Sequence, residues 1–173
     1  RLVSTGLMEL PLRVVQYGLG PIGQATARAV LDRSSTLLVG AVDVDAKKVG
    51  QDVAALLGGD RSPTGIAVSD QAATVLHEQR PDVVLHATTS TLPSVDEQLR
   101  TCAAGGAHVV SSTEELAFPY ERHPERAEEI DRVAREAGVV VVGTGVNPGY
   151  AMDTLPLTAT GVCTSVDAIR VER

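Results

Sequence analysis

The sequence predicts a doubly wound α/β fold, in which helices cover both faces of a parallel sheet. Short valine-rich segments alternate along the 173 residues with longer helical patterns, an order that right-handed crossovers wind into one sheet. Aromatic residues make up only 2% of the chain. We therefore expect a core of Val, Leu, Ile and Ala, as in strands buried on both faces.

Each element is predicted from its own pattern. Strands are expected at the apolar runs of residues 12–17, 37–43, 83–87, 108–111 and 139–143. Helices are expected between them at residues 21–33, 49–57, 70–79, 93–104 and 124–137. Pro21 suits a first helical position. The pairs Gly58-Gly59 and Gly105-Gly106, and the single Gly138, suit the left-handed residue that ends a helix.

The turn after the first strand reads Gly18-Leu19-Gly20-Pro21-Ile22-Gly23. Gly18 permits a tight turn, Gly20 lets the backbone approach a pyrophosphate, and Gly23 lets helix and strand pack closely. The helix that opens at Pro21 and Ile22 presents unpaired N–H groups to the phosphates. The motif predicts a Rossmann-type site for NAD or NADP; the alternative is a purely structural turn.

Asp43 bears on which dinucleotide binds. It ends the second strand, 20 residues after Gly23, where a carboxylate accepts the ribose hydroxyls and repels a 2′-phosphate. NAD is therefore favoured over NADP. Lys47 and Lys48 follow, and they either soften this repulsion or are simply solvated.

The carboxyl ends of the later strands carry polar residues. Ligands of open α/β sheets bind at such ends, so we expect a neutral, hydrogen-bonding site for nicotinamide and ribose. Its candidate residues are Thr88, Ser90, Ser112, Thr113 and Asn147. The alternative is that the hydroxyls cap the following helices.

Glu114 and Glu115 follow one of these strand ends. A carboxylate beside the nicotinamide is a candidate general base, although acids are also favoured there by a helix dipole. His86 ends a buried strand and is as plausible in a core role as in a functional one. No metal site is expected, because the other histidines lack ligand spacing.

Composition excludes several classes of protein. The net charge of −7 argues against nucleic acid or an anionic membrane as partner. No apolar run approaches the roughly 20 residues that span a bilayer. Cys102 and Cys163 have neither metal nor redox spacing, which favours a reducing, cytoplasmic setting without disulfides.

The two ends of the chain suggest a domain organisation. Residues 1–7 precede Met8 and are expected to be an artificial extension outside the fold. Residues 165–172 alternate in polarity, which predicts a strand. We expect a dinucleotide-binding domain over residues 8–150. Residues 151–173 are then a connecting helix and the first strand of a second, α+β domain that is cut off.

Three segments together resemble a known family. They are residues 14–23, residues 112–116 and residues 143–150 with Met152-Asp153. The chain is similar to the dihydrodipicolinate-reductase-like superfamily, and within it to the 2,4-diaminopentanoate dehydrogenases and related amine dehydrogenases. The glutamate pair and the Asn147-Pro148-Gly149 segment carry more weight than the glycine turn, which is common.

The resemblance implies an N-terminal nucleotide-binding domain followed by a domain for substrate binding and homo-oligomerisation. It also implies NAD(P)-dependent chemistry on the C–N bond of a small amine or imine. Glu114 would activate the nitrogen or water nucleophile, with Glu115 in reserve, and Asn147 would approach the nicotinamide carboxamide. The reductases' Gly-Thr-Thr-Gly loop is replaced here by Ser112-Thr113-Glu114-Glu115, and their His-His and Lys motif is absent. Two alternatives stay open, a 4-hydroxy-tetrahydrodipicolinate reductase and a nucleotide-binding module without turnover.

Overall fold

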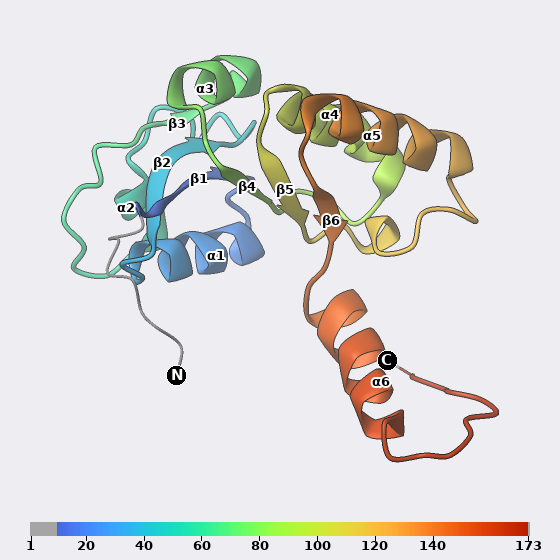
Figure 1. The fold of residues 1–173 in the computed structure, drawn as a ribbon. Helices are drawn as coiled ribbons and strands as arrows, with labels where there is room; N and C mark the ends of the chain where they lie inside the picture. Colours follow the sequence, from blue (N-terminus) through green and yellow to red (C-terminus); the bar gives the residue numbers. More distant parts are fainter. Residues whose placement is uncertain (1–9, 173) are drawn as a thin grey trace.

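The computed structural model describes residues 10–172, which form one six-stranded parallel sheet with helices on both faces (Figure 1). The strands are β1 (Leu12–Tyr17), β2 (Thr36–Val42), β3 (Val68–Ser69), β4 (Val83–His86), β5 (His108–Ser111) and β6 (Val141–Gly143). Their order in the sheet is β3-β2-β1-β4-β5-β6. This is the doubly wound Rossmann order, whose direction reverses between β1 and β4. The predicted fold class is confirmed.

The helices divide between the two faces of the sheet. They are α1 (Pro21–Leu31), α2 (Val53–Leu57), α3 (Ala72–Gln79), α4 (Asp96–Ala104), α5 (Pro124–Ala137) and α6 (Leu155–Thr160). Helices α3, α4 and α5 lie over one face, and α1 lies over the other (Figure 1). Shorter turns are η1 (Leu92–Ser94), η2 (Glu114–Leu116) and the wider η3 (Val146–Thr154).

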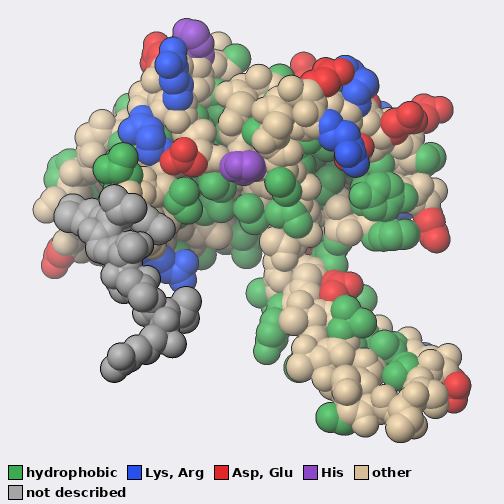
Figure 2. Space-filling view, viewed as in Figure 1, with side chains coloured by type: hydrophobic (Ala, Val, Ile, Leu, Met, Phe, Trp, Pro, Cys, Tyr) green, Lys and Arg blue, Asp and Glu red, His purple; other side chains and the backbone are tan. Residues whose placement is uncertain are grey.

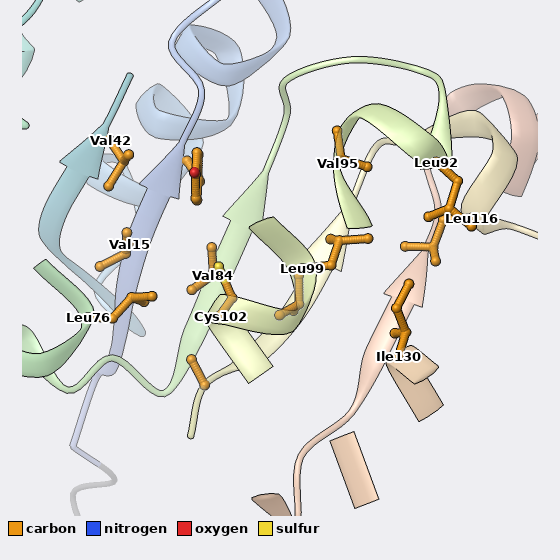
Figure 3. Close-up of a cluster of buried hydrophobic side chains, with 13 residues drawn as sticks. Val15, Val42, Leu76, Val84, Leu92, Val95, Leu99, Cys102, Leu116 and Ile130 are labelled. Atoms are coloured by element: carbon orange, nitrogen blue, oxygen red, sulfur yellow. The ribbon is translucent and has the colours of Figure 1, made fainter. Parts of the chain in front are cut away.

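Two hydrophobic clusters hold these layers together. Successive residues of a strand point to opposite faces, so Val15 joins one cluster and Val14 the other. Figure 3 shows the first cluster, where Val15 and Val84 of the sheet pack among side chains of α3, α4 and α5. As the composition predicts, this core is almost entirely aliphatic. Its strands place their carboxyl ends along one edge of the sheet.

Several elements differ from the sequence expectations. Strand β3 was not predicted, because two residues that pair only with Ala41 and Val42 are too short to show a periodic pattern. Helix α2 begins at Val53 rather than at 49, since the Asp52 side chain accepts from the Ala54 N–H at 2.8 Å and caps it there. The helix expected over residues 93–104 is divided into η1 and α4 by Val95, whose backbone is not helical (φ −130°, ψ −6°).

The strand predicted over residues 165–172 is not formed in the described residues, and its place in a second domain stays a prediction. This segment is irregular, and it has no strand beside it among the described residues to complete a hydrogen-bonded ladder. Figure 2 shows the region around α6 standing away from the rest of the surface, with hydrophobic side chains on it. Leu155 and Leu157 of α6 are 52% and 64% exposed. The expectation for residues 1–7 lies outside the described residues, and the domain boundary at 150 stays a prediction.

Candidate functional site: a cavity at the carboxyl edge of the sheet

The glycine turn joins β1 to α1 as the motif requires, and its three glycines have different surroundings. A Cβ on Gly18, whose φ is +87°, would lie 2.2 Å from the Ala87 carbonyl oxygen. A Cβ on Gly23 would lie 1.9 Å from the Gly18 carbonyl oxygen. Neither position therefore has room for a side chain, because the protein's own backbone occupies the space. A Cβ on Gly20 would meet no atom within 4 Å, so that backbone faces open space.

The turn is held from below by Gln16, which the sequence analysis missed. Gln16 is fully buried in β1, and its Nε2 donates to the carbonyl oxygens of Gly18 at 3.0 Å and Leu85 at 3.1 Å. Thr26 of α1 donates its hydroxyl to Gln16 Oε1 at 2.7 Å. The available signal was one amide among the valines of a buried strand, because such a group must be hydrogen-bonded.

Asp43 supports the turn from the side of β2. Its Oδ2 accepts from the Leu19 N–H at 2.7 Å and from Lys48 Nζ at 3.0 Å, and its Oδ1 accepts from the Asp45 N–H at 2.9 Å. Burial opposes ionisation, but these donors outweigh it and lower the pKa of Asp43. The carboxylate therefore stays charged and fixes the position of the turn.

A cavity of about 680 Å³ opens where the strand order reverses. It extends from the start of α1, past the ends of β4 and β5, to the loop after β6. Eight predicted site residues line it: Gly20, Pro21, Ile22, Thr88, Ser90, Ser112, Glu114 and Asn147. The structure thus brings together residues that are up to 127 positions apart in the sequence. Gly18, Gly23, Asp43, Thr113 and Glu115 lie outside the lining of this cavity.

Thr113 has a different role from the one expected. Its side chain is only 1% exposed, and its hydroxyl donates to the Thr89 carbonyl oxygen at 2.9 Å. It therefore holds the loop after β4 instead of lining the cavity. Ser112, its neighbour, does line the cavity. The expectation for Thr113 did not allow for the alternation of side-chain directions at the end of a strand.

His86 belongs to a buried polar network in the lining of the cavity. Its Nδ1 lies 2.8 Å from Ser111 Oγ, and its Nε2 lies 2.8 Å from Gln98 Oε1. Burial, which the hydrogen bond to Gln98 only partly offsets, lowers the pKa of His86, so the ring is neutral at pH 7. His86 thus joins the ends of β4 and β5 to α4.

The two glutamates of η2 have separate surroundings. Glu114 lines the cavity, whereas Glu115 is directed toward α5. Glu115 Oε2 accepts from the Leu92 N–H and from His123 Nε2, each at 2.9 Å, and Oε1 lies 2.9 Å from Arg122 Nη1. The hydrogen bond from Leu92 is the largest cause of a lowered pKa for Glu115. Glu115 is therefore not placed to act as a base in the cavity, which corrects its position as the reserve candidate.

Asn147 lines the cavity after β6. Its Oδ1 is buried and has no hydrogen-bond partner within the described residues. A buried polar atom of this kind is costly unless another group satisfies it. The open face at Gly20 and the acceptor on Asn147 are the features that a bound dinucleotide would use, so the residues present fit such a cofactor.

Residues 10–172 contain neither a cluster of metal-ligating side chains nor a membrane-spanning helix. No group of three or more His, Cys, Asp or Glu side chains in this part of the chain is placed to hold a metal ion. None of the helices in the same residues is both long and apolar enough to cross a membrane.

The strand order and the cavity at its switch point define a Rossmann-type nucleotide-binding domain. Residues 12–144 match the family described as dihydrodipicolinate reductase, N-terminus. The chain belongs to this family.

Several relatives are similar over nearly the whole chain. A 2,4-diaminopentanoate dehydrogenase of Acetoanaerobium sticklandii is 34% identical over 94% of the chain and 46% of its own length. An amine dehydrogenase of Streptomyces virginiae is 30% identical over 93% of the chain and 45% of its own length. The solved structure of an amine dehydrogenase from Mycobacterium smegmatis superposes with a TM-score of 0.82 at 37% identity, covering 90% of this chain and 45% of that one. The chain thus spans less than half the length of these relatives.

Proposed function

We propose that this chain provides the cofactor site of an NAD(P)-dependent oxidoreductase that interconverts a small amine and the corresponding imine. The observation that carries the proposal is one cavity whose lining holds the open glycine turn at Gly20, a carboxylate at Glu114 and an amide at Asn147. The dehydrogenases to which the chain is similar support an amine as substrate.

Each part of the cavity has a task in this proposal. The first N–H groups of α1, unpaired within the helix, bind the diphosphate beside Gly20. Asn147 Oδ1 accepts from the carboxamide of the nicotinamide, while Thr88, Ser90 and Ser112 hydrogen-bond to the ribose and the ring. When bound, the cofactor supplies the hydride acceptor or donor. Glu114 takes a proton from the attacking water or the substrate nitrogen and returns it in the reverse direction.

The site near Asp43 favours NAD, and Lys48 moderates this preference. Asp43 would repel the 2′-phosphate of NADP, yet the Lys48 ammonium lies 3.0 Å from its Oδ2 and offsets that charge. Asp43 already accepts from Leu19, so it contributes to both the turn and the choice of cofactor.

Replacing Lys48 by alanine is expected to weaken NADP binding about tenfold, a loss of about 1.4 kcal/mol, and to leave NAD binding within about twofold. The physical reason is that the unpaired Asp43 carboxylate repels the additional phosphate more strongly. Titrations of NADH and NADPH followed by nicotinamide fluorescence measure both affinities. Lys47→Ala is the control, since Lys47 has no ion pair with Asp43. Equal losses for both cofactors in Lys48→Ala would contradict the assignment.

The reaction itself is tested with the longest natural form of the protein that carries this chain. We expect small aliphatic amines and diamines to drive reduction of NAD⁺ or NADP⁺. Water then hydrolyses the resulting imine to a carbonyl compound and ammonia. Reduction of a cyclic imine by NAD(P)H without turnover of amines would instead indicate a 4-hydroxy-tetrahydrodipicolinate reductase, the activity named in the family description. Tight dinucleotide binding without any turnover would indicate a binding module.

We also propose how the protein assembles and where in the cell it acts. The exposed apolar side chains on and near α6, such as Leu157 and Val162, support contact with further protein, and we propose a homo-oligomer formed outside the nucleotide-binding domain. The net charge of −7 supports a small molecule, and not nucleic acid or a membrane, as the partner of the cavity. Two free cysteines support the cytoplasm as its location.

A further inference from the structure

Three hydrogen bonds join the segment after β5 to the loop after β4. The Thr113 hydroxyl donates to the Thr89 carbonyl oxygen at 2.9 Å. The Glu115 N–H donates to the Ser90 carbonyl oxygen at 3.2 Å. The Leu92 N–H donates to Glu115 Oε2 at 2.9 Å. Two of the three contacts come from Glu115, one through its backbone and one through its carboxylate.

These contacts join two walls of the cavity. Ser90, on the loop after β4, and Glu114, on η2, both line it. Ser90 accepts one of the three hydrogen bonds, and Glu114 lies between Thr113 and Glu115, which donate two of them. Leu92, which follows on the first wall, is fully buried and anchors that loop in the core. Loss of one of these hydrogen bonds would therefore let Ser90 and Glu114 move relative to each other.

The Glu115 carboxylate is itself held from α5. His123, the residue before α5, lies 2.9 Å from Oε2, and both side chains are only 17% exposed. Arg122 lies 2.9 Å from Oε1 but is 76% exposed, so water weakens its contribution. A hydrogen bond from a backbone N–H to an ionised carboxylate is stronger than one between neutral groups. The hydrogen bond from Leu92 to the Glu115 carboxylate is thus the strongest of the three.

We propose that Glu115 is a positioning residue, which fixes the Ser90 loop against η2 and so sets where the Glu114 carboxylate stands at the nicotinamide end of the cavity. The catalytic half of this inference rests on the proposed function. The structural half, that Glu115 fixes the Ser90 loop against η2, does not.

Glu115→Ala and Glu115→Gln test the inference together. In Glu115→Ala we expect hydrogen exchange at the Leu92 amide to accelerate about tenfold, as one hydrogen bond is lost. The fluorescence of bound NADH, which reports on the nicotinamide environment, should fall. With an amine substrate kcat should fall about 100-fold, as for a displacement of about 1 Å. The Kd for the dinucleotide should stay within about twofold, because the diphosphate contacts at Gly20 are unaffected. Glu115→Gln keeps an acceptor for Leu92 and should restore most of each value.

The control is Glu121→Ala, which removes an exposed carboxylate from the same connection. Unchanged Leu92 exchange in Glu115→Ala would overturn the inference, and so would a Kd that rises in parallel with the fall in kcat. Equal damage in Glu115→Gln and Glu115→Ala would also overturn it. A wild-type protein that turns over no amine contradicts the proposed function alone. In that case Leu92 exchange and bound-NADH fluorescence still decide the role of Glu115.

Discussion

Replacing Gly20 by alanine is expected to weaken dinucleotide binding at least about 100-fold and to leave the melting temperature unchanged. Gly20 has φ −68° and ψ −174°, a conformation open to alanine, and its Cβ would meet no protein atom within 4 Å. The added methyl group would instead occupy the space through which the diphosphate approaches the N–H groups of α1. Titration with NADH and thermal unfolding of the same sample measure both quantities.

Gly23→Ala is the matched comparison, since it adds the same methyl group three residues away. Its Cβ would lie 1.9 Å from the Gly18 carbonyl oxygen, so β1 and α1 would have to separate. We expect a loss of about 1–3 kcal/mol in the free energy of unfolding, typical of overpacking. If Gly20→Ala bound NADH normally, the assignment of the diphosphate to this turn would be wrong.

Glu114→Gln is expected to reduce amine turnover about 10²- to 10⁴-fold, the range typical of losing a general base. Glutamine has nearly the same shape but cannot take a proton at neutral pH, so the Kd for the dinucleotide should stay within about twofold. Steady-state kinetics on the longest natural form, with cofactor titrations beside them, give both numbers. Glu121→Gln is the control for removing one exposed carboxylate from this region.

A Glu114→Gln enzyme that retained kcat within about threefold would show that another group moves the proton. A parallel loss of turnover and dinucleotide affinity would show that Glu114 acts in binding and not in proton transfer.

The fold was predictable because its strongest signals are local. Val14 and Val15 face opposite cores, and a strand buried on both faces reads as a continuous apolar run. The glycine turn was predictable for a similar reason, since close backbone contacts at Gly18 and Gly23 permit no side chain. Strand β3 was missed because two residues are too few to show an alternation of apolar and polar side chains. The segment 165–172 alternates in polarity but forms no strand in the described residues, because it has no partner strand there to complete a ladder.

The candidate site was predictable in its location but not in the direction of each side chain. Ser112 and Thr113 are adjacent and polar, yet one lines the cavity and the other is buried below the loop. Glu114 and Glu115 divide in the same way. These directions depend on the turn that η2 makes and on donors from distant segments, such as the Leu92 N–H, which sequence spacing does not reveal.

A crystal structure of the protein with NAD⁺ or NADP⁺ bound tests the central assignment most directly. We expect the diphosphate to lie against the N–H groups of α1 beside Gly20. The nicotinamide carboxamide should donate to Asn147 Oδ1, on the side of the cavity that Glu114 lines. A dinucleotide bound in the reverse direction, or bound elsewhere on the molecule, would contradict this account.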